Sequence, residues 1–146
     1  MTFCHHATIF VRGASTSQSI TTGGTFEKLT AFTTDGISNA MTAAAASDKI
    51  TATTAGVYMV CFQVSFSGTV SSTVQFVVKW NGVEQDQIKC TRKLGTGGDV
   101  GSASMMGLVD VTSVPTDIEV WFTTDGDGDS ITVEDAQLAA HWLSTT

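Results

Sequence analysis

Charged residues are scarce in this chain of 146 residues. Asp, Glu, Lys and Arg make up 14% of it, against about a quarter in ordinary soluble domains. A chain with so few charges either aggregates or covers much of its surface in an assembly. The seven basic residues are scattered and the net charge is −7. These features exclude a nucleic-acid partner, because phosphate backbones are bound by clustered lysines and arginines.

Cysteine is also rare, and the three cysteines are Cys4, Cys61 and Cys90. An odd number is a poor basis for a disulfide framework, so we expect a protein made in a reducing compartment. The first twelve residues lack the apolar run and basic start of a signal peptide. No stretch reaches the roughly 18 apolar residues of a membrane helix. We therefore expect no membrane segment, and synthesis in a cytoplasm.

The strongest positive signal is the run Ala55–Gly68, in which apolar residues alternate without a break. A period of two places them on one face of a strand. They are Tyr58, Val60, Phe62, Val64 and Phe66. The opposite face carries Met59, Cys61, Gln63 and Ser65. Because this second face is semi-apolar, we expect both faces to be covered, one by a second sheet and the other by another subunit.

Similar short runs recur along the chain and are separated by Gly, Asn, Asp and Ser. Thr73–Trp80 alternates, Asn81-Gly82 supplies the two residues of a tight hairpin turn, and Val83–Thr91 returns as the partner strand. The pattern predicts an all-β protein, a jelly-roll sandwich of about eight to ten antiparallel strands.

We expect one domain, formed by residues 25–146 and preceded by an N-terminal segment, residues 1–24. That segment is either a plain first strand or an arm that orders on a partner. Its apolar residues are the candidates for contact with such a partner. They are Phe3, Ile9 and Phe10.

The order of these features resembles one family. AGVYMVCF is followed by a strand ending in Asn-Gly, then Arg92, the loop GTGGDVGSAS, the strand IEVWFTT and a closing strand ending at Leu143. This order is similar to the trimeric jelly roll of the tumour-necrosis-factor and complement-head superfamily. Lys49 to Leu143 resembles, more narrowly, the versions found in structural proteins of tailed bacteriophages. The chain departs from animal members in having no collagen stalk, signal peptide or paired cysteines.

The resemblance implies a homotrimer in which one sheet packs around the threefold axis. It then implies that four side chains approach neighbouring subunits. They are Met59, Cys61, Trp121 and His141.

Two groups of residues resemble metal ligands. Asp125, Asp127 and Asp129 look like the front of a calcium loop, but Ser130 replaces the glycine and Ala136 the glutamate that such a loop requires. They remain weak candidates beside a second interpretation, an exposed acidic turn. The adjacent Cys4, His5 and His6 are soft ligands, yet neighbouring residues rarely all reach one ion, and no second pair follows at metal spacing. We expect neither a metal nor a cofactor.

Catalytic motifs are missing from the sequence. It has no nucleophile elbow, zinc-protease helix or phosphate loop, and only three histidines to act as general bases. A metal enzyme on a jelly roll, such as a cupin, would need a histidine-rich strand pattern that this chain lacks. We therefore expect a protein that is not an enzyme.

Together these expectations favour a capsid decoration (cement) protein of a bacteriophage. It would sit on the exterior of the virion, contact the major capsid protein and bridge capsomers. The alternative is a receptor-binding tip of a head fibre or tail fibre. Tip domains usually hang from a coiled-coil stalk, and the sequence has no heptads.

Overall fold

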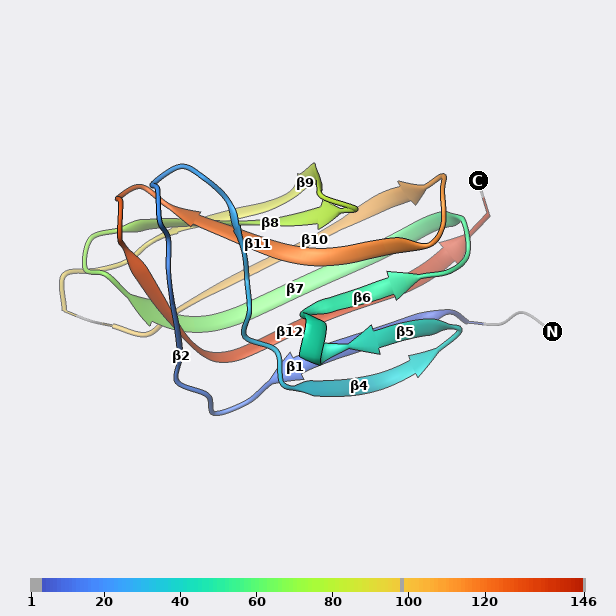
Figure 1. Ribbon diagram of the computed structural model, residues 1–146, viewed down its shortest axis with the longest axis horizontal. Helices are drawn as coiled ribbons and strands as arrows, with labels where there is room; N and C mark the ends of the chain where they lie inside the picture. The colour runs from blue at the N-terminus through green and yellow to red at the C-terminus, as the bar shows by residue number, and fades with distance from the viewer. Residues whose placement is uncertain (1–3, 98, 146) are drawn as a thin grey trace.

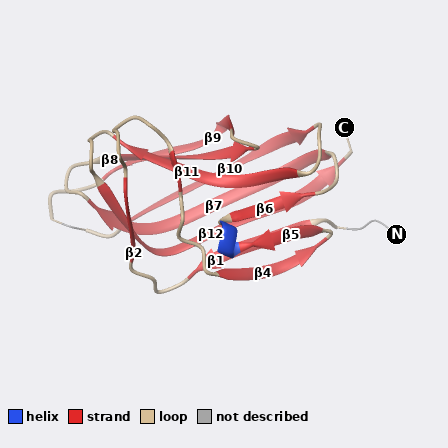
Figure 2. Cartoon of the chain, in the orientation of Figure 1, coloured by secondary structure: helices blue, strands red, loops and turns tan. Residues whose placement is uncertain are grey.

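The computed structural model describes residues 4–97 and 99–145, which form two stacked antiparallel sheets (Figure 1). Almost all of the regular structure is strand, and one short 3₁₀ turn, Ala45–Ser47, joins two of the strands (Figure 2). No helix among the described residues has the length and apolar character that crossing a membrane demands. The all-β jelly-roll prediction is confirmed, although the described chain has twelve strands rather than eight to ten.

Sheet A has six strands in the order β10-β7-β12-β1-β4, with β2 paired to the other end of β12. Their bounds are β1 His6–Val11, β2 Thr16–Ser19, β4 Thr34–Asn39, β7 Gly56–Gly68, β10 Gly101–Val111 and β12 Ser130–Ser144. The long strand predicted from alternation, β7, therefore lies inside this sheet, between β10 and β12.

Sheet B has the order β5-β6-β11-β8-β9, with β3 paired to β11. Its strands are β3 Glu27–Lys28, β5 Met41–Ala44, β6 Lys49–Ala52, β8 Thr73–Trp80, β9 Val83–Lys93 and β11 Thr116–Thr124. The turn between β8 and β9 is Asn81-Gly82, and both residues have positive φ, at 46° and 81°. Asn and Gly tolerate that conformation, which explains the tight hairpin.

Aromatic side chains from both sheets fill the space between them. Phe76 of β8 lies at the centre, with ring centroids 5.5 Å from Phe62, 5.2 Å from Phe66 and 6.2 Å from Phe122. Tyr58 is fully buried, and its hydroxyl donates a hydrogen bond of 2.7 Å to the carbonyl of Thr54. The apolar face predicted for β7 is thus the face that packs on sheet B.

Two strands, β4 and β5, form without a clear alternation of apolar residues in the sequence. β4 is almost entirely exposed and β5 is half-buried. Both end the main order of their sheets, so each pairs on one side only within that order and buries few apolar side chains. β4 and β5 are strands because they form hydrogen bonds with a neighbouring strand. No local periodicity in the sequence predicts them. β3 is also short, with only the two residues Glu27 and Lys28.

The first described strand, β1, is part of the sandwich. β1 pairs with β12 on one side and β4 on the other. For His6–Val11, the structure therefore has the first of the two alternatives, a plain strand. β1 and β12 are antiparallel, so the beginning of β1 and the end of β12 meet at one end of the molecule (Figure 1).

Candidate functional site

The outward face of sheet A is a broad surface built from neighbouring strands in register. One row across β10, β7, β12 and β1 is Leu108, Met59, His141 and His6. The next is Met106, Cys61, Ala139 and Thr8, and the third is Ser104, Gln63, Gln137 and Phe10. These three rows, with Ile37 of β4, are called the A-face below.

Large apolar side chains stand exposed on the A-face. Ile37 is 74% exposed, Met106 65% and Leu108 56%. Three hollows, of about 500, 400 and 340 Å³, also lie along sheet A. The smallest is lined almost entirely by apolar atoms, between Ile37, Met59 and Cys61. An apolar, hollowed sheet surface is typical of a surface that packs on another protein.

Basic residues are missing from this sheet. None of the six strands of sheet A contains Lys or Arg, and six of the seven basic residues of the chain lie on strands of sheet B. The seventh, Arg12, directly follows β1, with its guanidinium 5.8 Å from the centre of the Phe10 ring.

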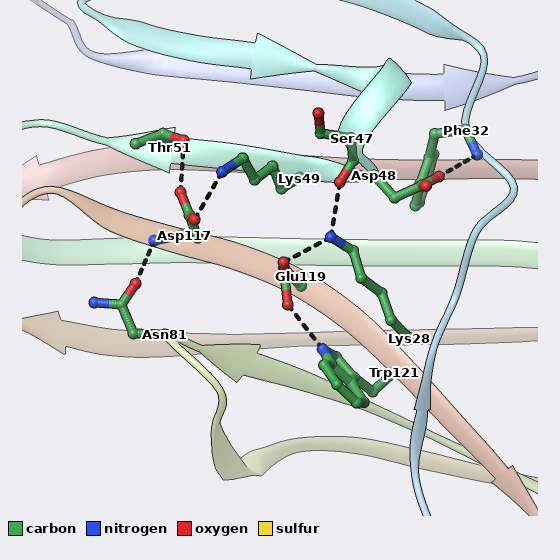
Figure 3. Close-up of polar contacts among 10 residues, drawn as sticks. All are labelled: Lys28, Phe32, Ser47, Asp48, Lys49, Thr51, Asn81, Asp117, Glu119 and Trp121. Carbon is green, nitrogen blue, oxygen red and sulfur yellow. Dashed lines mark hydrogen bonds and ion pairs between the residues drawn. The ribbon is translucent and has the colours of Figure 1, made fainter.

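The outward face of sheet B, called the B-face, is covered by paired charges (Figure 3). The Lys28 ammonium lies 2.6 Å from Glu119 and donates to the carbonyl of Ser47 at 2.7 Å. Lys49 lies 2.8 Å from Asp117. The five ion pairs found among the described residues all join residues of β3, β6, β8, β9 and β11.

Asp117 shows how this network acts on a carboxylate. Burial raises the pKa of its carboxyl, but hydrogen bonds from Lys49 and Thr51 lower it by more, and the net pKa lies below the usual 3.8. The charged form of Asp117 is therefore stabilised in the folded protein. Lys28, Lys49, Lys79 and Lys89 of sheet B thus each have a carboxylate partner within the chain.

Three of the residues expected between subunits come together on the A-face. Met59 lies opposite His141 in the register of β7 and β12, and Cys61 lies opposite Ala139. Burial raises the pKa of the Cys61 thiol, which keeps it protonated and unreactive as a nucleophile.

Trp121 does not join them on the A-face, and its expected approach to a neighbouring subunit stays a prediction. It belongs to β11, at the middle of sheet B. Its ring lies under the Lys79 ammonium, 4.3 Å from the centroid, and its indole N–H donates to Glu119 at 3.0 Å. Both sheets carry alternating apolar residues, so periodicity does not indicate which sheet a strand enters.

The residues expected to contact the capsid are also separated. Ile9 is fully buried in the core, which corrects its assignment to a contact surface. Phe10 points the other way, onto the A-face, because successive residues of a strand alternate. Phe3 lies outside the described residues.

Each of the three aspartates of the acidic turn accepts a hydrogen bond from a neighbouring segment of the chain. Asp125 accepts from the backbone N–H of Thr73 at 2.8 Å, and Asp129 accepts from the Ser72 hydroxyl at 2.7 Å. Asp127 accepts from the Gly23 N–H at 2.7 Å. These bonds fasten the turn to two neighbouring segments of the chain.

Sequence analysis missed the apolar side chains contributed by β10. The strand buries Met105, Val109 and Val111 and exposes Met106 and Leu108. Strict alternation from Met105 would have shown this. Ile37 carried no such signal, because β4 has no alternating pattern.

Known structures share this architecture. Eiger TNF from S. frugiperda superposes with a TM-score of 0.70 at 12% identity, covering 99% of this chain and 96% of that one. Murine APRIL, in a crystal structure at pH 5.0, superposes with a TM-score of 0.60 at 14% identity, covering 94% and 99%. The chain has the tumour-necrosis-factor-like jelly-roll fold.

The likeness to these structures is one of shape. No protein-family model matches the sequence, and no curated protein matches it. At 12% and 14% identity, the tumour-necrosis-factor-like neighbours establish the fold alone. Function therefore has to be argued from the surfaces of this chain.

Proposed function

We propose that the chain assembles as a homotrimer in which the A-face of each subunit packs around a threefold axis. The observation that carries this proposal is the contrast between the two outward faces. The A-face exposes Ile37, Met106 and Leu108 on strands without Lys or Arg, whereas the B-face carries ion pairs between lysines and carboxylates. A trimer would remove the exposed apolar surface from water at about 25 cal/mol per Å².

The role we propose for this trimer is that of a bacteriophage capsid decoration protein on the exterior of the virion. Three things support it: the resemblance of Lys49 to Leu143 to tailed-phage structural proteins, the scarcity of charge, and the missing catalytic motifs. The action would be mechanical and not enzymatic. Surface buried against the major capsid protein would bridge capsomers and resist internal pressure.

Two measurements test the proposal in sequence. Light scattering coupled to size exclusion should give three times the chain mass of 15.3 kDa. A monomer at that stage ends the trimer proposal. The trimer is then mixed with phage capsids that lack their decoration protein and sedimented. Saturable co-sedimentation supports the cement function, with bovine albumin as the control for trapping.

The second function, a receptor-binding tip, is an outcome of the same experiment. If the trimer does not bind capsids at saturating concentration but binds host cells, the receptor-binding function replaces the cement function. A trimer that binds neither would leave the assembly and remove both functions.

A further inference from the structure

The fold brings three metal-ligating side chains together at one end of sheet A. Cys4 precedes β1, His6 begins it, and His141 lies opposite His6 near the end of β12. The Cys4 sulfur is 3.4 Å from Nε2 of His141. One donor atom from each of the three residues lies within 4.8 Å of the others.

We propose that Cys4, His6 and His141 form a binding site for a zinc ion. A thiolate and two imidazoles are the soft and intermediate donors that zinc prefers, and they fit calcium or magnesium poorly. With bonds of about 2.0–2.3 Å, tetrahedral zinc holds its donors roughly 3.3–3.8 Å apart. The Cys4–His141 distance lies in that range. The three donor atoms lie within 4.8 Å of one another, and rotation of the exposed Cys4 and half-buried His6 side chains would shorten the other distances to it.

The surroundings of His6 orient it as a ligand. Its Nδ1 lies 3.0 Å from the carbonyl oxygen of Cys4. Because a carbonyl only accepts, Nδ1 carries the proton and Nε2 is left with a free lone pair. Metal-bound histidines are commonly oriented in this way. The side chain of Asn39 donates to the same carbonyl at 3.0 Å, which holds the Cys4 backbone in place.

His5, although adjacent in sequence, belongs to a different environment. Its ring stacks on Trp142, with centroids 5.4 Å apart and an angle of 29° between the planes. The backbone N–H of Trp142 donates a hydrogen bond of 2.9 Å to the backbone carbonyl of His5. His5 is thus held by the end of β12, while His6 and His141 stack on each other with centroids 6.3 Å apart. The site therefore takes two ligands, Cys4 and His6, from the Cys-His-His segment, and the fold supplies the third, His141.

The three protein ligands would fill three of the four coordination positions of a tetrahedral zinc ion and leave the fourth open. The hollow of about 340 Å³ begins at His6 and His141 and runs along Met59 and Cys61. A water molecule or a donor from a partner would complete the tetrahedron there. The proposal goes beyond capsid decoration and does not depend on it, because all three ligands come from one chain.

Titration of the chelator-treated, reduced protein with zinc against a competing chromogenic chelator tests the site. We expect one ion per chain. Cobalt should give a thiolate-to-metal charge-transfer band together with the intense visible bands of a tetrahedral ion. His141→Gln and Cys4→Ser should each weaken zinc binding at least tenfold, since even outer-shell partners of a metal contribute about 10–100-fold.

The matched control is His5→Gln, which removes an imidazole from the same segment and should leave the zinc affinity unchanged. Zinc should also raise the melting temperature of the wild type and of His5→Gln, but not of His141→Gln, because the ion joins the first strand to the last. Circular dichroism confirms that each variant is folded, and His6→Gln replaces His141→Gln if that variant is not.

Two results would overturn the proposal. If His141→Gln binds zinc as tightly as the wild type, the N-terminal segment chelates the ion by itself. If the folded wild type binds less than one ion per chain at micromolar zinc, there is no site. Neither result bears on the mass of the assembly, so the fate of the zinc site is separate from that of the proposed function.

Discussion

The two outward faces of this sandwich are built on the same backbone pattern and solve the problem of exposure differently. The B-face carries lysines beside carboxylates, and Lys79 covers the ring of Trp121. The A-face has apolar and uncharged polar side chains in the same kind of rows, with no lysine on its strands. A solvated sheet face is normally the polar one. The comparison therefore indicates which face is built for contact.

Composition alone hides this asymmetry. A charged fraction of 14% describes the whole chain, but the basic residues are concentrated on one sheet. The ammonium groups on the B-face lie over Trp121 and near Phe26, at 4.3 to 5.8 Å from the ring centres. An aromatic residue on an outward face is thus covered within the chain on one sheet, while Met106 and Leu108 stay uncovered on the other.

The largest effect is expected from charging the A-face. The double variant Met106→Glu with Leu108→Glu should convert the trimer to monomer, because an unpaired charge buried in an interface costs several kcal/mol. Light scattering measures the mass. The matched control is Val83→Glu, which charges a residue 64% exposed at the start of β9 on sheet B and should leave the mass unchanged. Equal masses for the two variants would remove the distinction between the faces.

A smaller effect is expected from breaking the charge network of the B-face. In Lys28→Met, the Glu119 carboxylate still accepts a hydrogen bond from the Trp121 indole N–H but has lost its ion pair with the Lys28 ammonium. The Glu119 side chain is only 15% exposed, so water replaces that ion pair poorly. The free energy of unfolding should fall by about 1–3 kcal/mol, measured by urea denaturation. The assembly mass should not change. A variant that dissociates without losing stability would place the interface on sheet B instead.

The smallest effect concerns the pH dependence of Asp117. Its folded pKa lies below 3.8, so its stabilisation is present above the unfolded pKa and is lost as the pH falls through the folded pKa. Asp117→Asn should therefore cost about 1 kcal/mol at pH 7 and progressively less toward about pH 2. Urea curves for both proteins across that range measure the difference. A constant difference would show that the ion pair with Lys49 contributes nothing.

The elements that sequence analysis located are those whose signal is local. β7 and β8 appear from their alternation, and the β8–β9 hairpin appears from Asn81-Gly82. Tyr58 was placed in the core for the same reason, and it is buried. In each case a few consecutive residues contain the whole physical cause, whether a period of two or a backbone that tolerates positive φ.

Strands that form only because a strand distant in the sequence pairs with them were not predicted from the sequence. β4 is polar and exposed, and is a strand because β1 offers it hydrogen bonds. β12 is one strand of 15 residues with irregular register between Val133 and Asp135. A bulge interrupts the alternation without interrupting the strand, so the period fails where the strand continues.

By itself, the sequence determined that the chain is an all-β sandwich, which residues of β7 form its core, and that charge is scarce. Only the tertiary structure decided which outward face received the lysines, that Trp121 lies apart from Met59, and that Cys4 and His6 meet His141. The physical reason is the same in all three cases. Alternation fixes which side of a strand a residue takes, but hydrogen bonding between distant strands fixes which sheet and which neighbours it has.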